Sequence, residues 1–229
     1  MAVKHIEKKG ILLVFPQENK RDPASLWYEL HPRTKMRWEW DADGDQKVSD
    51  LWHLRERLSL SNKVVYSKWF RGRATLMSFD VFCAILRLQN PDLPDARGLT
   101  LTSREVLDLL EEDSPLSTKQ LKKATGLQGR EAEAAYQRAL KELWERLLIV
   151  AYGEVDEGAF PSLAVGATRT IFEPLWDRAA AMTDEEAREI LAEKLVAGSA
   201  FEKFWKSLEK KRAQNSNLRR SESENESSF

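Results

Sequence analysis

The chain has 229 residues, of which 42% are hydrophobic and 32% charged, and its formal net charge is −1. This length allows one or two domains with a sizeable buried core, and the near-neutral charge excludes nucleic-acid binding driven by overall attraction alone. No apolar run approaches the roughly 18 residues that a membrane helix needs, and no apolar signal core follows the basic N-terminus. We therefore expect a cytoplasmic protein with no membrane partner.

Cysteine and histidine usage argues against redox and metal chemistry. Cys83 is the single cysteine and lies in an apolar run, which predicts a buried, unreactive thiol and excludes an intramolecular disulfide. His5, His31 and His53 have no metal-ligand spacing, and no glycine-rich phosphate loop is present. The sequence predicts neither a metal nor a cofactor.

Residues 1–98 form a tryptophan-rich region in which short helices alternate with short strands. Pro16 closes the first strand because proline cannot donate to a ladder, and Ser25 and Ser78 stand where helix caps are expected. The expected elements are a short amphipathic helix, a strand over 11–15, helices over 26–30 and 51–60, a strand over 63–66 and a buried helix over 79–88. Residues 90–98, with two prolines and a glycine, predict a loop or linker.

Residues 99–173 show the order helix, short helix, glycine turn, long helix and two strands, which is typical of a winged helix-turn-helix. Thr102–Glu105 and Ser117–Gln120 have the capping-box pattern that opens a helix, and Gly126 fits the left-handed position that ends one. The expected elements after this turn are a helix from 130 to about 147 with a sustained apolar stripe, a strand over 148–152, a wing tip over 153–158 and a returning strand over 164–172.

Residues 174–209 predict C-terminal helices, the second of which opens with a third capping box, Thr183–Glu186. From Lys210 to residue 229 almost no apolar residues occur, so this tail is expected to be disordered. The predicted fold is α+β, mainly α with short β: a winged helix-turn-helix, with an α/β region before it and helices after it.

Short motifs along the chain point to one family. They are Leu26-Trp27, Trp38-Glu39-Trp40, Tyr66-Ser67-Lys68, Arg71 to Arg73, Ser78-Phe79-Asp80 and Pro115-Leu116-Ser117-Thr118. Together they resemble the AlkZ-related branch of the winged-helix DNA glycosylase superfamily over roughly residues 10–208. The resemblance implies tandem winged helices, with residues 1–98 forming a divergent first one, and double-stranded DNA as the partner. In the full enzymes it also implies removal of alkylated or cross-linked bases.

The sequence departs from those enzymes in two respects. They carry a β-barrel after the winged helices, which we do not expect within 229 residues. Their catalytic signature is a Gln, an intervening residue and a second Gln or Asp, and here Gln89 and Gln128 are followed two residues on by Pro91 and Arg130. No catalytic residue can be carried over from the family.

Two surfaces are expected to bind nucleic acid. The first interleaves bases with aromatic residues and comprises Lys63, Lys68, Trp69, Arg71 and Arg73. The second lies on and before the long helix and comprises Lys119, Lys122, Lys123, Gln128, Arg130, Gln137, Arg138 and Lys141. Residues 1–98 carry 17 Lys and Arg against 13 Asp and Glu, whereas residues 99–174 carry 9 against 13. Because phosphate contacts need cations, we prefer the first surface. The alternative for Trp69 and Phe70 is burial in the core.

Three functions fit these observations. We expect a non-catalytic winged-helix protein that binds double-stranded DNA in repair or regulation. The first alternative is a DNA glycosylase acting on alkylated bases, which would need a water-activating group in a base-sized pocket. The second is an interaction module in which the winged helix serves as a scaffold for a homodimer or a partner protein. The acidic wing tip Asp156-Glu157 suits this second alternative, since it would repel a phosphate backbone.

Overall fold

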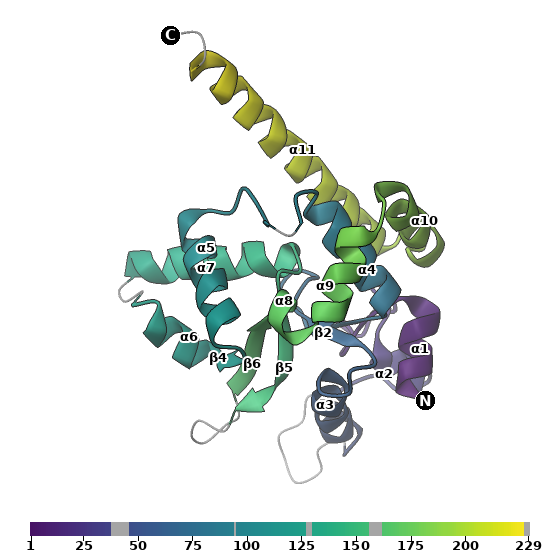
Figure 1. The fold of residues 1–229 in the computed structure, drawn as a ribbon. Coiled ribbons are helices and arrows are strands. Elements are labelled where there is room, and N and C mark those ends of the chain that lie inside the picture. Colours follow the sequence, from purple (N-terminus) through teal and green to yellow (C-terminus); the bar gives the residue numbers. More distant parts are fainter. Residues whose placement is uncertain (38–45, 94, 127–129, 156–161, 227–229) are drawn as a thin grey trace.

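The computed structural model describes residues 1–37, 46–93, 95–126, 130–155 and 162–226. Within them, helices surround one antiparallel sheet with the strand order β1-β3-β2-β5-β6-β4 (Figure 1). The α+β class is confirmed. The Trp38-Glu39-Trp40 motif, Gln128 and the predicted wing tip at Asp156-Glu157 lie outside the described residues.

The strands are β1 (Ile11–Leu13), β2 (Val65–Ser67), β3 (Thr75–Met77), β4 (Leu116–Ser117), β5 (Ile149–Val155) and β6 (Ser162–Ala167). The helices are α1 (Ala2–Lys9), α2 (Leu26–Leu30), α3 (Gln46–Ser59), α4 (Phe79–Gln89), α5 (Leu101–Glu112), α6 (Thr118–Ala124), α7 (Arg130–Glu145), α8 (Thr168–Ile171), α9 (Glu173–Ala181), α10 (Asp184–Lys194) and α11 (Ala200–Glu226).

Helix boundaries follow the local capping chemistry at several predicted positions. The Ser78 hydroxyl accepts a hydrogen bond from the Val81 amide at the start of α4. Reciprocal capping boxes at Ser117 and Thr183 open α6 and α10, as predicted. Gly126 follows the C-cap of α6 with φ +64°, a conformation that glycine adopts without strain. These local patterns therefore determine where four of the helix ends fall.

The predicted capping box at Thr102–Glu105 is wrong. Helix α5 begins at Leu101, and Thr100 caps it by accepting a hydrogen bond from the Ser103 amide at 3.3 Å. The Thr100 hydroxyl also donates to Glu142 on α7 at 3.1 Å. Because this second partner lies 42 residues away, the local sequence pattern could not distinguish the two threonines.

The returning strand is shorter than predicted. Strand β6 ends at Ala167, and Thr168 begins α8 instead of continuing the strand to Phe172. The Thr168 hydroxyl donates to the Leu147 carbonyl at 2.6 Å, and its amide donates to the Leu148 carbonyl at 2.9 Å. These two bonds turn the chain out of the sheet, which is why the strand stops.

Helix α11 continues to Glu226, where the composition predicts a disordered tail (Figure 1). Its first turns are held by buried apolar residues, among them Phe201 and Phe204. Propagating a helix costs less than starting one, so the polar residues that follow extend a helix that packing has already nucleated.

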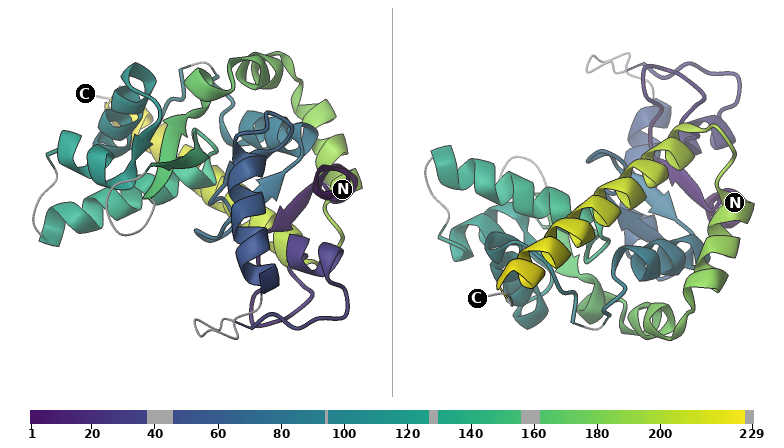
Figure 2. Two further views of the ribbon diagram at one scale, coloured as in Figure 1. Left: turned by 90° about the horizontal axis from the view of Figure 1, so that it is seen from below. Right: turned by 90° about the horizontal axis from the view of Figure 1, so that it is seen from above.

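The sheet joins the N-terminal and central regions. Antiparallel pairing of Tyr66 with Ala151 connects β2 to β5. Beside this pairing, Arg55 on α3 forms a buried ion pair with Glu154 on β5, and the Ser59 hydroxyl accepts from the Gly153 amide at 3.0 Å. Helix α11 runs across both regions (Figure 2, right). The two regions predicted from the sequence therefore share one sheet and one covering helix.

The Arg55–Glu154 pair gives a stability prediction. Both side chains are under 10% exposed, at 6% and 9%. Replacing Arg55 alone with Met leaves a buried carboxylate unpaired, so we expect Arg55→Met to lower the free energy of unfolding by about 3–5 kcal/mol. Arg55→Met with Glu154→Met should recover most of that loss. Denaturant unfolding measures both variants.

The exposed pair Lys20–Glu18 supplies the control, because both side chains are 66% exposed and water screens them. Lys20→Met should leave the unfolding midpoint unchanged. An Arg55→Met protein as stable as the wild type would show that the buried pair does not hold the two regions together.

Candidate nucleic-acid interface

An open groove of about 800 Å³ lies where the N-terminal region, α7 and α11 meet. The turn between β2 and β3 forms one wall, α7 a second, and α11 a third. The polar and charged residues along it are Lys68, Arg71, Thr118, Gln137, Lys141, Glu145 and Ser207. The groove thus brings together residues from both predicted surfaces, which lie about 70 positions apart in the chain.

The turn after β2 presents Arg71 to solvent. The Gly72 amide donates to the Lys68 carbonyl at 3.1 Å, and the Arg73 amide donates to the Phe70 carbonyl at 2.9 Å. Arg71 and Gly72 both have positive φ, +52° and +73°, and for Arg71 this conformation is costly. The Arg71 guanidinium lies 5.3 Å from the centroid of the Phe70 ring, within cation–π range. Lys63 and Arg73 are also exposed.

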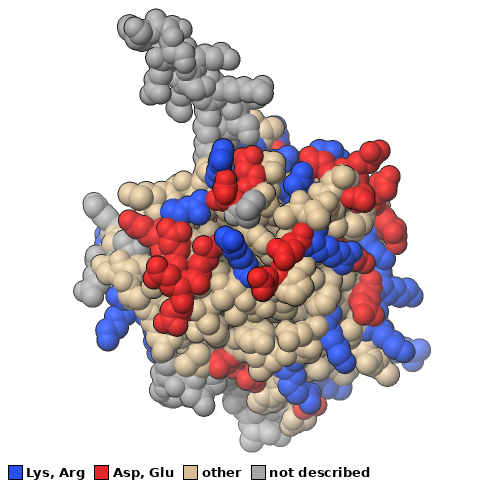
Figure 3. Space-filling model, viewed as in Figure 1, with Lys and Arg blue, Asp and Glu red and all other residues tan. Residues whose placement is uncertain are grey.

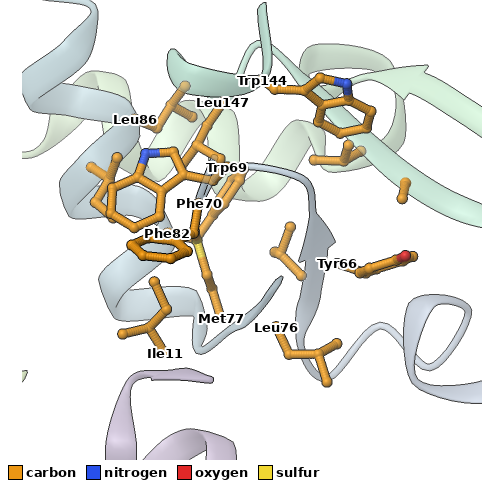
Figure 4. Packing of buried hydrophobic residues seen from close by; sticks show 14 of the residues in the cluster. Ile11, Tyr66, Trp69, Phe70, Leu76, Met77, Phe82, Leu86, Trp144 and Leu147 are labelled. Carbon is orange, nitrogen blue, oxygen red and sulfur yellow. The ribbon is translucent and has the colours of Figure 1, made fainter. Parts of the chain in front are cut away.

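Trp69 does not provide the stacking surface predicted for it. Its side chain is 0% exposed, and its ring packs edge-on against Phe204 with the centroids 4.9 Å apart. Phe70 is also buried and packs against Phe201 and Phe204. Figure 4 shows both rings inside the hydrophobic cluster. The alternative that Trp69 and Phe70 are buried in the core is confirmed. Phe201 and Phe204 of α11 cover the two rings.

Lys68 is half-buried at the edge of this cluster and lines the groove. Its ammonium group has no hydrogen-bond or ion-pair partner among the described residues. Burial, and secondarily the positive charge of Arg55, lowers the pKa of Lys68 below its ordinary value. A desolvated cation that lacks an anionic partner favours either an incoming anion or loss of its proton.

The second predicted surface is only partly on the groove. Gln137 and Lys141 line it, whereas Arg130 and Arg138 are exposed on α7 outside it. Lys119 and Lys123 on α6 are exposed as well. Lys122 forms an ion pair with Glu133, whose pKa is lowered chiefly by that contact.

Glu145 is a groove residue that the sequence did not single out. Its side chain is 11% exposed, and it pairs with Lys141 at 3.8 Å and with Lys211 at 3.0 Å. It is the one carboxylate among the described residues that line the groove. No local pattern marks it, because its partner Lys211 and the groove residue Ser207 come from α11.

Other chemical groups are dispersed. Among the described residues, no three His, Cys, Asp or Glu side chains gather where a metal ion could bind. In the same part of the chain, none of the helices is both long and apolar enough to cross a membrane. On the face drawn in Figure 3, acidic side chains gather in a patch at the left, and basic side chains are scattered without forming a continuous field.

The prediction that the Cys83 thiol is buried and unreactive can be tested by chemical labelling. Its side chain is fully buried and donates to the Leu175 carbonyl at 3.5 Å, and burial raises the pKa of the thiol to about 11. This lowers the thiolate fraction at pH 8 by about 100-fold relative to an ordinary cysteine. A thiol reagent at pH 8 should therefore label Cys83 in denaturant and leave the folded protein unlabelled. Equal labelling rates would contradict this burial.

The comparisons with known proteins agree with the motif resemblance. A family model described as AlkZ related matches residues 1–211. No curated protein and no solved structure matches the chain significantly. Because the family match spans most of the sequence, this chain belongs to the AlkZ-related family.

Proposed function

We propose that this protein binds double-stranded DNA without catalysing base removal, and that it does so in DNA repair. The observation that carries the proposal is the half-buried Lys68, which has no ionic partner among the described residues, in a groove that Arg71 and Lys141 also line. Membership of the AlkZ-related family supports the repair context.

A winged helix supplies the framework in this proposal. Helices α5, α6 and α7 follow in order, the short strand β4 pairs with β6, and β5 with β6 forms the hairpin after the long helix. This is the element order of winged-helix DNA-binding units. The long helix α7 would then contribute both to the groove, through Gln137 and Lys141, and to the exposed surface, through Arg138.

The groove suits phosphates better than stacked bases. Its aromatic residues Trp69, Tyr136, Trp144 and Phe204 are each less than 10% exposed, so their ring faces are already packed. The groove cations remain accessible, and each phosphate contact needs such a cation. Contacts of this kind fix the position of a duplex without reading its sequence.

The residues that line the groove also argue against catalysis. A glycosylase needs a group that activates water next to the sugar. Glu145 is the one carboxylate among the described groove residues, and two lysines already pair with it. Both of its oxygens are thereby engaged, Oε1 by Lys141 and Oε2 by Lys211, which leaves neither of them free to hold a water molecule beside a sugar.

Charge reversal on the turn tests the binding proposal. Arg71→Glu with Arg73→Glu should weaken duplex binding by about tenfold or more and reduce the slope of log K against log salt by about 2. The measurement is a fluorescence titration of labelled duplex DNA between about 50 and 200 mM salt. Lys4→Glu with Lys8→Glu makes the same change in charge on the exposed face of α1, away from the groove, and should have little effect.

Two results would contradict this proposal in different ways. Absence of duplex binding at about 50 mM salt would remove DNA as the partner, which would favour the interaction-module alternative. Unchanged binding by the Arg71→Glu, Arg73→Glu protein, together with loss of binding by Arg138→Glu, would place the interface on the outer face of α7.

Family membership keeps the glycosylase as the second candidate, and Glu145→Gln separates the two. If Glu145 only offsets the groove cations, Glu145→Gln should tighten duplex binding several-fold, because one negative charge is removed. If Glu145 activates water, the wild type should release bases from alkylated DNA and Glu145→Gln should not. The measurements are the duplex titration above and chromatographic detection of released bases.

A further inference from the structure

The groove is too small for the duplex that the proposed function places on it. Its volume of about 800 Å³ lies within the roughly 300–1,000 Å³ of small-ligand sites. A double helix must therefore lie over the groove, and only a short stretch of one strand, on the order of one nucleotide, can enter it. Arg71 and Lys141 line the groove together with Lys68, so phosphates on either side of an entering sugar would meet cations.

Lys68 is the nucleophilic group in this space. Arg71 is a guanidinium that stays charged, and Lys141 is exposed and pairs with Glu145. Lys68 is half-buried and has no anion beside it within the described residues, and Arg55 lies near enough to destabilise its charged form. A lysine next to another cation in an apolar setting is a recognised form of activated amine.

We infer that Lys68 captures the aldehyde of an abasic nucleotide in DNA by forming a covalent imine with the ring-opened sugar. The inference rests on the proposed DNA binding, since the duplex brings the sugar to the groove. An abasic sugar fits because it carries no base, and the described residues of the groove offer no exposed aromatic face on which a base could stack. Capture is stoichiometric and reversible, so it requires no turnover.

The step balances without any co-reactant. The neutral Lys68 nitrogen attacks C1′ of the open-chain aldehyde, and the carbonyl π electrons move to oxygen, giving a carbinolamine. A carbon–nitrogen double bond then forms as the carbon–oxygen bond breaks. The oxygen leaves as water with both hydrogens of the amine. Nothing is oxidised or reduced, and addition of water reverses the capture.

Reductive trapping tests the inference. The full chain is incubated with a duplex carrying one abasic site and with borohydride, which converts an imine to a stable secondary amine. We expect a covalent protein–DNA adduct on a denaturing gel, with peptide mapping placing it on Lys68. A duplex carrying the tetrahydrofuran analogue, which has no aldehyde, should give none.

Two lysine variants test whether the adduct depends on the Lys68 amine. Lys68→Arg keeps the positive charge and removes the nucleophilic amine, so we expect the adduct to disappear even at duplex concentrations that saturate this variant in the binding titration. Lys8→Arg is the matched control, because this side chain is exposed on α1 away from the groove, and it should form the adduct as the wild type does. An unchanged circular dichroism spectrum and melting temperature would show that Lys68→Arg folds.

A second probe separates this inference from the proposed function. Deoxyribose 5-phosphate carries the same aldehyde and a phosphate, and trapping it needs no duplex binding. Adduct formation at Lys68 with this sugar, but no duplex binding, would overturn the proposed function and leave the Lys68 chemistry standing. Duplex binding with no adduct from either probe, or an adduct that survives in Lys68→Arg, would overturn the inference alone.

Discussion

The pairing of β2 with β5 is the contact on which the rest of the molecule depends. One register pair, Tyr66 with Ala151, joins a sheet built from two regions of the chain. The first two walls of the groove are placed relative to each other by this joint, because Lys68 and Arg71 follow β2 whereas α7 leads into β5. The buried Arg55–Glu154 pair crosses the same joint and fixes α3 against β5. This single short pairing can hold the two regions together because side-chain contacts between α3 and β5 reinforce it.

Some buried polar groups at and beside the joint lack partners among the described residues. The Arg55 Nε and Trp69 Nε1 atoms are buried without hydrogen-bond partners among the described residues, and Lys68 is half-buried without an anion. Each of these arrangements costs stability, since a desolvated polar group loses its water without gaining a partner. Such costs concentrate where a protein interacts with something else. Their position beside the groove is therefore consistent with a ligand site there.

Short sequence motifs correctly predicted the helix ends that depend only on neighbouring residues. Ser78, Ser117 and Thr183 cap helices because each can bond an amide within three residues, and Gly126 ends α6 because its φ is positive. The predictions failed where a distant segment decides. Glu142 moves the cap of α5 from Thr102 to Thr100, and α11 covers Trp69. The groove itself could not be predicted, since its three walls come from segments that only the tertiary fold brings together.

Charge counting along the sequence also overstated the repulsion between α7 and DNA. Three of its acidic residues are engaged within the protein. Glu133 pairs with Lys122, Glu142 accepts hydrogen bonds from Thr100 and Ser103, and Glu145 pairs with Lys141 and Lys211. Lys122 and Lys211 come from other helices, so their positive charges offset those of Glu133 and Glu145, which counting charges on α7 alone leaves out. Arg138 has no such partner among the described residues, and it lies one helical turn from Lys141. Lys68 and Arg71 of the first predicted surface and Lys141 of the second therefore line one groove, and Arg138 lies on α7 just beyond it.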